Sequence, residues 1–407
     1  MQESILPQTE THERVNASPP PRIVVGITNA QTCLVLTGRL RALREAGFRV
    51  TLVSSPGTLL EGRGRDEGVE TVAVPMERKI ALLRDSVALV RLWRFLREAH
   101  PDVVEFSTPK AGLLGLLAAT LARVPRRVYL LRGLKLETAS GIKREILRIA
   151  EQLTVACAHT VLCNSASLRR RAMELGIGPA AKLQVLGAGS SVGVDVERFY
   201  PERTDVRERL GLPVDGQVIG FVGRLTRDKG VPELLDAFEG ILQKRPETYL
   251  MLVGWFDAAE DALDRSLRNR ILIHRRIVCT GFVSDPAPYY GAMDLLILPT
   301  LREGFPNAVL EASASGIPVI TTLSTGARDA VVPNVTGLLV PAGCTGAIVE
   351  AAERLLGDQN LRLRMGDAGR AWVTARFADR DVLGRNTRFY TNLLMPQDAM
   401  DSALRSQ

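Results

Sequence analysis

Short apolar runs alternate with longer amphipathic segments along most of this chain of 407 residues. In the first half, these runs predict buried strands over residues 22–27, 48–53, 102–106, 127–131 and 160–163. The pattern turns polar near Tyr200 and then restarts, with strands predicted over 218–222, 249–253, 277–280, 295–298 and 318–321. Strands separated by helices in this way are typical of a parallel, doubly wound sheet.

The interruption near residue 200 predicts two domains, because 407 residues exceed what one ordinary core holds. We expect two Rossmann-like α/β domains, over residues 21–200 and 201–381. One helix is predicted near 34–46, ending at Gly47, and a last amphipathic segment spans 371–394. Residues 1–20 are polar and lack an apolar signal core, so we expect a disordered leader there.

The composition argues against a transmembrane protein and against a metal site. Apolar residues make up 46% of the chain, yet no uninterrupted apolar run reaches the length of a transmembrane helix. The cysteines are scattered, without a C-x-x-C pair or a histidine cluster: Cys33, Cys157, Cys163, Cys279 and Cys344. They indicate structural thiols in a reducing cytoplasm and argue against a metal site.

Positive charge is concentrated in the first half of the chain. Residues 1–200 hold 28 basic and 19 acidic side chains, a net of +9, whereas the remainder holds 24 and 26, a net of −2. The segments 79–97 and 143–148 have basic and apolar faces, which suit an anionic membrane surface. The simpler interpretation is that these helices cover their own sheet and expose a basic face. Nucleic acid is disfavoured, since aromatic side chains for base stacking are few.

The segment from Glu303 to Glu311 carries the first candidate chemistry. A short apolar run ends at Pro299, a loop with Glu303 and Gly304 follows, and Pro306 stands where a helix should begin. Free N–H groups at a helix N-terminus suit a phosphate. Glu311 would lie about 8–9 Å along the helix axis from Pro306. The alternative is two solvated acids on an ordinary strand–loop–helix unit.

A basic loop upstream makes a phosphate site more plausible. The run 218–222 predicts a strand that ends at Gly223, and Arg224 and Lys229 follow it before a helical pattern begins. Open α/β sheets bind ligands at the carboxyl ends of their strands, and these two cations suit a diphosphate there. The alternative is a basic turn on the surface.

Together, the Gly-Arg-Leu-x-x-x-Lys-Gly motif at 223–230 and the Glu-x7-Glu motif at 303–311 resemble the retaining GT-B glycosyltransferases of family 4. Further motifs, such as Thr108-Pro-Lys-Ala-Gly and Thr325-Gly-Ala-Arg-Asp, resemble a branch that builds capsule and lipopolysaccharide on polyprenyl-diphosphate carriers. The resemblance implies two Rossmann-like domains facing a cleft. It also implies that a C-terminal helix, about 382–396, packs back on the first domain.

The resemblance implies roles for residues of the second domain. Arg224 and Lys229 would neutralise the donor diphosphate and the departing nucleoside diphosphate, so no metal cofactor is expected. Glu303 would bind the donor sugar and Glu311 the ribose. The other implied donor-binding residues are Gly223, Gly254, Phe282, Val283, Gly304, Phe305, Pro306, Asn307 and Ala308.

In the first domain, Thr28 and Asn29 would face the cleft, and Thr108, Lys110, Arg132 and Lys135 are candidates for binding the acceptor. Many relatives carry a histidine at the cleft end of a first-domain strand, but here the candidate segments hold Glu105 and Arg132 instead. No histidine is therefore assigned a catalytic role. Glu105 is either a participant or a buried structural acid.

The resemblance implies a retaining transferase that moves a hexose or N-acetylhexosamine from a UDP-sugar to a polyprenyl-diphosphate-linked saccharide. We expect a cytoplasmic protein that is peripheral on the inner face of the membrane. Two alternatives share the fold: a UDP-sugar 2-epimerase and a non-catalytic sugar-nucleotide-binding protein. The first would need acid and base groups that the motifs do not supply, and the second would not need Glu303 beside a phosphate site. A nicotinamide oxidoreductase is disfavoured, since no Gly-x-Gly-x-x-Gly follows the first strand.

Overall fold

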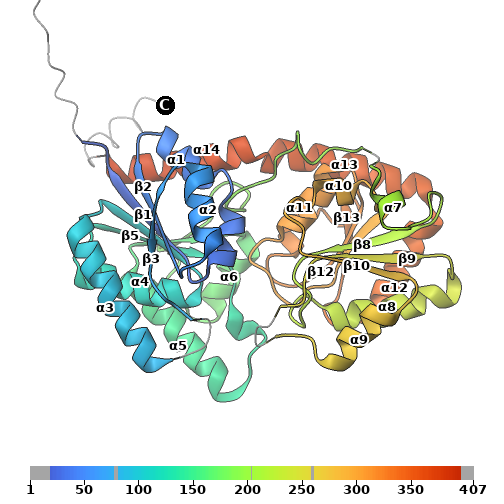
Figure 1. The fold of residues 1–407 in the computed structure, drawn as a ribbon, viewed down its shortest axis with the longest axis horizontal. Coiled ribbons are helices and arrows are strands. Elements are labelled where there is room, and N and C mark those ends of the chain that lie inside the picture. The colour runs from blue at the N-terminus through green and yellow to red at the C-terminus, as the bar shows by residue number, and fades with distance from the viewer. Residues whose placement is uncertain (1–18, 78–80, 203, 258–260, 396–407) are drawn as a thin grey trace, which may run out of the picture.

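The computed structural model describes residues 19–77, 81–202, 204–257 and 261–395, and the structural statements below concern these residues. The expected leader over residues 1–20 lies outside this range except for Pro19 and Pro20. The described chain forms two α/β lobes side by side (Figure 1). None of its helices combines the length and the apolar character needed to cross a membrane.

The first lobe is built on a parallel sheet with strand order β3-β2-β1-β4-β5-β6-β7. Its strands are β1 Arg22–Gly26, β2 Arg49–Ser54, β3 Glu70–Ala73, β4 Val103–Ser107, β5 Arg126–Leu131, β6 Thr160–Cys163 and β7 Leu183–Gln184. Its helices are α1 Arg39–Glu45, α2 Thr58–Glu67, α3 Leu82–Ala99, α4 Pro109–Leu121, α5 Gly141–Cys157 and α6 Ala166–Glu174, with 3-10 helices η1 Ala30–Leu36 and η2 Lys135–Glu137. Separate apolar cores lie on its two faces, as expected for a sheet with helices on both sides.

The second lobe has a parallel sheet with strand order β10-β9-β8-β11-β12-β13. Its strands are β8 Val218–Val222, β9 Tyr249–Val253, β10 Ile277–Gly281, β11 Leu295–Leu298, β12 Val319–Thr322 and β13 Gly337–Val340. The helices from this half of the chain are α7 Val206–Arg209, α8 Val231–Lys244, α9 Arg265–Ile273, α10 Ala287–Tyr290, α11 Asn307–Ala314, α12 Thr345–Gly357, α13 Gln359–Phe377 and α14 Asp379–Leu394, with the 3-10 helix η3 Arg328–Ala330. The predicted fold class, two doubly wound parallel-sheet domains, is confirmed.

Two sequence-based expectations need correction. The single helix near 34–46 is wrong, because the chain breaks at Gly38, whose φ of 74° lies in the left-handed region, between η1 and α1. Three strands were not predicted: β3, β7 and β13 lie at the edges of the two sheets. β3 and β7 bury few of their side chains, so their sequences lack the continuous apolar runs of β1 or β11. β13, in contrast, is a buried apolar run of four residues that was simply not identified as a strand.

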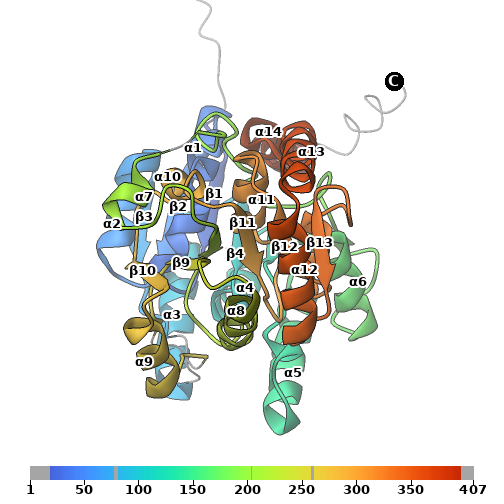
Figure 2. The same cartoon turned by 90° about the vertical axis from the view of Figure 1, so that its right-hand side faces the viewer.

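The last helix, α14, crosses back to the first lobe (Figure 1), and Figure 2 shows it beside α13. Tyr390 is fully buried in a core of the first domain, and Phe389 packs against the same core. At the crossing, Val194 N donates to Phe377 O at 2.8 Å and Asp379 N donates to Val194 O at 2.9 Å. The two connections between the lobes therefore run side by side and are hydrogen-bonded to each other.

A buried ion pair attaches α14 to the first sheet. Arg39 on α1 donates to both carboxylate oxygens of Glu105 on β4, and the Tyr390 hydroxyl also donates to Glu105. Burial by itself would raise the pKa of Glu105, but Arg39 and the hydrogen bonds hold it below its ordinary value. Glu105 is thus a fully paired structural acid, the second of the two interpretations left open by the sequence.

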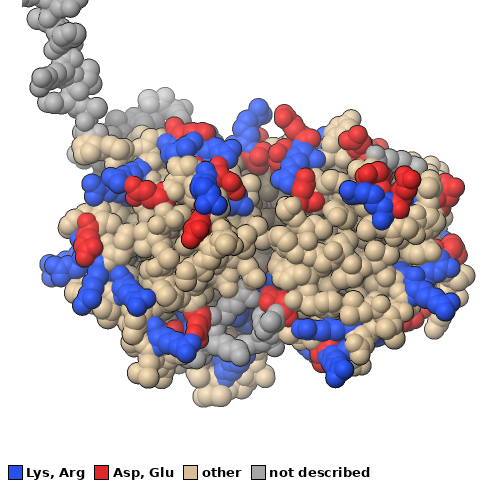
Figure 3. All heavy atoms as spheres, in the orientation of Figure 1, with Lys and Arg blue, Asp and Glu red and all other residues tan. Residues whose placement is uncertain are grey.

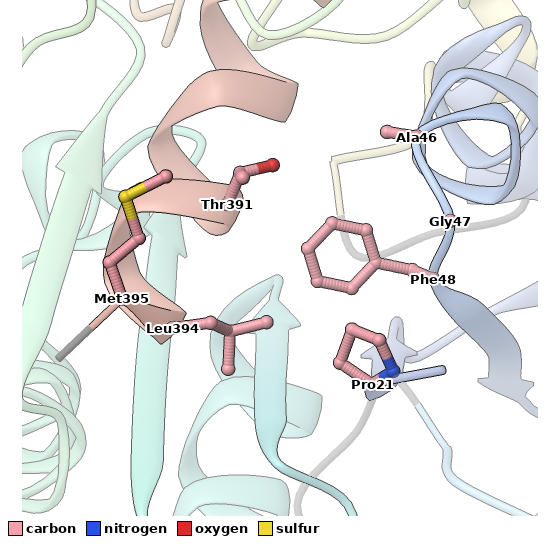
Figure 4. Close-up of a pocket in the computed structure, with 7 residues that line it drawn as sticks. All are labelled: Pro21, Ala46, Gly47, Phe48, Thr391, Leu394 and Met395. Atoms are coloured by element: carbon pink, nitrogen blue, oxygen red, sulfur yellow. The ribbon is translucent and has the colours of Figure 1, made fainter. Parts of the chain in front are cut away.

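A groove of about 330 Å³ lies where α14 ends beside the turn that joins α1 to β2 (Figure 4). Phe48 and Leu394 line it, together with Pro21 and Met395. None of the candidate site residues lines this groove.

Candidate functional site

The loop after β8 places Arg224 at the carboxyl edge of the second sheet. Arg224 Nη1 lies 2.6 Å from Asp257 Oδ2, and Asp257 follows the neighbouring strand β9. The backbone holds this arrangement, since Leu225 N donates to Trp255 O at 2.9 Å. The Arg224 side chain is 33% exposed, so it is partly buried although it lies on a loop.

Lys229 on the same loop forms an ion pair with Glu303. The two motifs therefore meet, although 74 residues separate them. Backbone contacts position the pair: Leu301 N donates to Asp228 O at 2.9 Å, and Gly230 packs so closely on Pro299 that a Cβ would lie 2.0 Å from its carbonyl oxygen. Lys229 is only 22% exposed, which argues against the alternative of a basic turn on the surface.

The helix α11 begins at Asn307, directly after Pro306, as the sequence predicts. Phe305 is buried against Phe377, with ring centroids 5.1 Å apart, and this contact fixes the chain just before the helix. Asn307 and Ala308 form the first turn and are only partly buried. Only Phe305 and Pro306 separate Gly304 from the first turn of the helix.

Glu311 lies further along α11 and is held by a tyrosine. The Tyr290 hydroxyl is 2.6 Å from Glu311 Oε2 and 3.3 Å from the carbonyl oxygen of Ala308. Burial raises the pKa of Glu311, and the hydrogen bond from Tyr290 opposes part of that rise. The carboxylate therefore has one fixed partner and a fixed direction.

The ends of β9 and β10 form the next part of the site. A Cβ on Gly254 would lie 1.8 Å from the carbonyl oxygen of Gly223. The backbone at the end of β8 therefore occupies the space beside Gly254. Phe282 is exposed and stands edge-on to Trp255 at 5.3 Å between centroids. Val283 packs against the core of the second domain.

The two lobes touch at the Glu303 loop. A Cβ on Gly304 would lie 1.9 Å from the carbonyl oxygen of Arg132, and one on Gly133 would lie 3.3 Å from Gly304 N. Gly326 packs on the same loop, where a Cβ would lie 2.6 Å from the Glu303 carbonyl oxygen. The segment that follows β5 in the first domain is therefore in backbone contact with the loop that carries Glu303.

The side chain of Arg132 contacts other residues of the first domain. Its Nε donates to Ser107 Oγ at 3.3 Å and its Nη1 to Ser191 Oγ at 3.1 Å, while Nη2 is buried and has no hydrogen-bond partner among the described residues. Burial, together with the nearby charge of Arg39, lowers the pKa of Arg132 to about 10. Arg132 thus remains a cation with one donor available.

The other first-domain candidates are engaged within the domain. The hydroxyls of Thr28 and Thr108 lie 2.7 Å apart, and Thr28 Oγ1 accepts from Ala111 N at 3.0 Å in the first turn of α4. Thr28 is buried, and these contacts hold its hydroxyl within the first domain. Asn29 Oδ1 accepts from Gln31 N at 2.7 Å, which caps η1.

The two candidate lysines lie on different elements. Lys110 on α4 forms an ion pair of 2.7 Å with Asp85 on α3. Lys135 begins η2, a short helix whose Glu137 accepts a 2.7 Å hydrogen bond from Thr325 of the other lobe. The structure thus brings Lys229 to Glu303 and the Gly304 backbone to that of Arg132, but ties Lys110 to α3.

Several site residues were missed by sequence reasoning. Asp257, the partner of Arg224, stands just beyond the carboxyl end of β9, a position that could have marked it. Tyr290, the partner of Glu311, had no distinguishing signal. Across the lobes, Ser167 N donates to Asp329 Oδ2 and Gly326 N donates to Ser167 Oγ, each at 2.8 Å. These contacts give the Thr325–Asp329 motif a structural role.

Within the described ranges, no three His, Cys, Asp or Glu side chains are grouped to hold a metal ion. Arg224 and Lys229 supply positive charge at the carboxyl edge of the second sheet. Both cations are already paired with carboxylates, so an anionic ligand would have to share or replace Asp257 and Glu303.

Comparisons with known proteins agree with this geometry. Residues 216–358 match the family "Glycosyl transferases group 1", and residues 35–189 match the "Glycosyl transferase 4-like domain". The capsular polysaccharide biosynthesis glycosyltransferase CapM of Staphylococcus aureus is 35% identical, over 90% of this chain and 96% of its own. The UDP-Gal:alpha-D-GlcNAc-diphosphoundecaprenol alpha-1,3-galactosyltransferase of Escherichia coli is 28% identical, over 73% of this chain and 78% of its own.

Solved structures confirm the fold. HepE of Anabaena, determined in complex with UDP-glucose, superimposes with a TM-score of 0.75 at 19% identity, over 91% of this chain and 99% of its own. Of the functions left open by the sequence, the family matches support the transferase rather than the epimerase or the non-catalytic binder. The chain belongs to the group 1, family 4 glycosyltransferases of GT-B fold, with relatives in the branch that builds capsule and lipopolysaccharide.

Proposed function

We propose that this glycosyltransferase moves a hexose or N-acetylhexosamine from a UDP-sugar to a polyprenyl-diphosphate-linked saccharide, with retention of the anomeric configuration. The observation that carries the proposal is the meeting of Lys229 with Glu303 at the start of α11, beside Arg224. The Escherichia coli relative, named for a UDP-galactose donor and a diphosphoundecaprenol-linked acceptor, supports this choice of substrates. The family relationship to a capsule enzyme supports a role in surface polysaccharide synthesis.

The donor diphosphate binds to Arg224 and Lys229, and main-chain N–H groups of Phe305, Asn307 and Ala308 add donors from the start of α11. Before the donor arrives, Asp257 and Glu303 neutralise these cations. The diphosphate takes over this role, because two negative charges at a helix N-terminus gain from both the cations and the helix dipole. Glu303 is then released toward hydroxyls of the donor sugar.

The nucleoside lies along the rest of the site. Glu311, oriented by Tyr290, accepts hydrogen bonds from the ribose hydroxyls. The base lies against Phe282 and Val283, where the exposed ring of Phe282 offers an apolar face. Gly223 keeps this wall free of a side chain, and Gly254 lets the backbone at the end of β8 approach it.

Transfer breaks the bond between the anomeric carbon and the diphosphate and forms a bond to an acceptor hydroxyl. The hydroxyl proton passes to the departing diphosphate, so no histidine base is required. Arg224 and Lys229 stabilise the charge that develops on this leaving group, a task that other transferases give to a divalent metal. No metal cofactor is therefore part of the proposal.

The acceptor approaches from the first domain. Arg132 has a buried N–H that lacks a partner in the described chain, and its carbonyl oxygen lies against Gly304, so it is placed to meet an acceptor phosphate. Lys135, Lys110, Thr108, Thr28 and Asn29 remain proposed members of this acceptor side. Because such an acceptor is anchored in lipid, the enzyme works as a peripheral protein on the inner face of the cytoplasmic membrane.

Two glutamine variants test the donor assignment. Glu311→Gln should mainly weaken UDP binding, because its partner is the ribose, whereas Glu303→Gln should mainly lower kcat, because it acts at the transferred sugar. Calorimetry with UDP and steady-state kinetics with a panel of UDP-sugars separate these effects. Equal losses of UDP affinity in both variants would overturn the roles given to the two residues.

A further inference from the structure

The outer face of α5 carries an apolar stripe that nothing in the described chain covers. Ile142, Ile146, Ile149 and Leu153 follow one another at the spacing of a single helix face, and all four are exposed. Ile142, near the start of the helix, is 79% exposed. The opposite face of α5 holds buried residues such as Val155 and packs on the first domain. The helix therefore has a second apolar face, unlike a helix that only covers its sheet.

A matching stripe runs along α3. Leu83, Val87 and Val90 repeat the same spacing and are exposed, with Leu83 at 86%, while Ala88 and Leu92 face the core. Leu82, next to Leu83, is exposed as well. The outer faces of both helices are basic and solvated, as the simpler interpretation of the sequence expects, but they also carry exposed apolar side chains. Of segment 79–97, Lys79 and Ile80 lie outside the described residues.

The two stripes lie on one side of the first domain. Helix α4 packs against both α3 and α5, so the three helices form a single layer (Figure 1). Each helix follows a strand of a parallel sheet, so its N-terminus lies at the carboxyl edge that faces the second domain. Leu83 and Ile142 therefore begin the stripes at the end of the layer where α4 carries Thr108 and Lys110. The ion pair between Lys110 and Asp85 joins this end of α4 to the α3 stripe.

Basic side chains border both stripes. On α3, Arg91 and Arg94 line one shallow groove together with Val87 and Val90, so charge and apolar surface share a face. On α5, Lys143, Arg144 and Arg148 stand among the exposed isoleucines. In Figure 3 the lower tip of the first domain shows mostly uncharged surface, with Lys and Arg above it. Isoleucine and leucine ringed by arginine and lysine suit a lipid boundary, where long basic chains reach the headgroups.

We propose that the stripes Ile142–Ile146–Ile149–Leu153 and Leu83–Val87–Val90 form a docking surface for an anionic lipid bilayer. The inference rests on the proposed function, because a lipid-linked acceptor gives the docking surface its purpose. Docking would bring the end of α4 that carries Thr108 and Lys110 close to the membrane. The apolar side chains enter the headgroup region, and the bordering cations bind anionic headgroups. A second copy of the chain is the competing occupant, and it is disfavoured because basic borders would face each other across a two-fold contact.

The test uses the full chain and vesicles of phosphatidylglycerol and phosphatidylethanolamine in equal parts. The wild type should float with these vesicles, bind less to phosphatidylcholine alone, and be released by high salt. Ile146→Ser combined with Ile149→Ser, and separately Val87→Ser combined with Val90→Ser, should each lower the partition coefficient by about tenfold or more. These side chains are exposed, so thermal unfolding should stay close to that of the wild type.

A matched control comes from the second domain. Leu272 and Ile273 on α9 are as exposed as the stripe residues, with Ile273 at 80%, and α9 also carries arginines. Leu272→Ser combined with Ile273→Ser should leave vesicle binding unchanged. Equal losses in this control would show that any exposed apolar pair supports binding and would overturn the assignment to α3 and α5.

Further outcomes separate the docking surface from its alternatives and from the proposed reaction. Sedimentation that shows a wild-type dimer, converted to monomer by the stripe variants without any vesicle binding, would assign the surface to a second copy instead. Stripe variants should retain wild-type turnover with a short-chain, water-soluble acceptor and lose turnover only with acceptor in vesicles. A wild type that floats but transfers sugar to no lipid-diphosphate acceptor would contradict the proposed function and leave the docking surface standing.

Discussion

Gly304 and Arg132 pack backbone against backbone across the two domains: a Cβ on Gly304 would lie 1.9 Å from the Arg132 carbonyl oxygen. The loop that carries Glu303 is therefore positioned partly by the first domain. Arg302 and Thr138 add a 3.0 Å hydrogen bond across the same junction. The proposed donor side and the proposed acceptor side of the site are therefore in contact at this loop.

Gly304→Ala should separate the domains locally and lower kcat. A methyl group cannot fit against the Arg132 carbonyl, and a displacement of about 1 Å at a reacting centre can cost on the order of 10²-fold in rate. Gly346→Ala is the matched control, because nothing lies within 4 Å of a Cβ at that position. Steady-state kinetics and thermal unfolding of both variants provide the measurement. Wild-type turnover in Gly304→Ala would show that this contact does not position the site.

Arg224→Ala and Lys229→Ala should each lower turnover by about 10²-fold or more, the usual scale for removing a preorganised electrostatic donor. Each change also leaves a carboxylate, Asp257 or Glu303, without its cation. Arg227→Ala serves as the control, since Arg227 lies on the same loop but pairs with Asp264 at the exposed surface. Near-normal kcat in both Arg224→Ala and Lys229→Ala, with UDP still bound tightly, would contradict the assignment of these residues to the donor diphosphate.

UDP binding should weaken at low pH through Glu311. The carboxylate must be ionised to accept hydrogen bonds from ribose, and burial raises its pKa, so affinity should fall as the pH drops through that raised value. The Tyr290 hydroxyl opposes the rise, so Tyr290→Phe should move the loss of affinity to higher pH. Calorimetric titration with UDP across a pH series measures both midpoints. Identical midpoints in the wild type and Tyr290→Phe would refute the linkage.

Activity should persist after exhaustive treatment with EDTA. In the proposed reaction, the leaving group is stabilised by parts of the chain itself: Arg224, Lys229 and the start of α11. Turnover before and after chelation, and after addition of Mg²⁺ or Mn²⁺, is the measurement. Complete loss of turnover that only a divalent metal restores would mean that Arg224 and Lys229 do not suffice to stabilise the leaving group.

Much of the architecture follows from local sequence. Central strands such as β8 and β9 are continuous apolar runs, and Pro306 marks the start of α11, so both were predictable from the printed residues. The pairing of Lys229 with Glu303 was not, because it depends on how two loops 74 residues apart fold together. Gly38 interrupts a predicted helix through its left-handed φ, which the helical pattern around it does not reveal.

The partners that orient the site were the hardest to anticipate. Asp257 and Tyr290 belong to no motif, and their roles appear only once β9 and α10 are placed beside Arg224 and Glu311. Thr28 adds a contact that its position after β1 did not indicate, because its hydroxyl accepts from Ala111 N in the first turn of α4. Local sequence identifies loops that can hold a ligand, whereas tertiary packing decides which side chains remain available.

The most direct test of the central claim is a transfer assay with the full chain, a panel of radiolabelled UDP-sugars and a polyprenyl-diphosphate monosaccharide. We predict transfer from at least one UDP-sugar, an α-linked product by NMR, and loss of that product in Glu303→Gln. GDP-sugars offered under the same conditions should give no product. Transfer only from a different nucleotide sugar, a β-linked product, or a UDP-sugar that is epimerised without transfer would contradict the account.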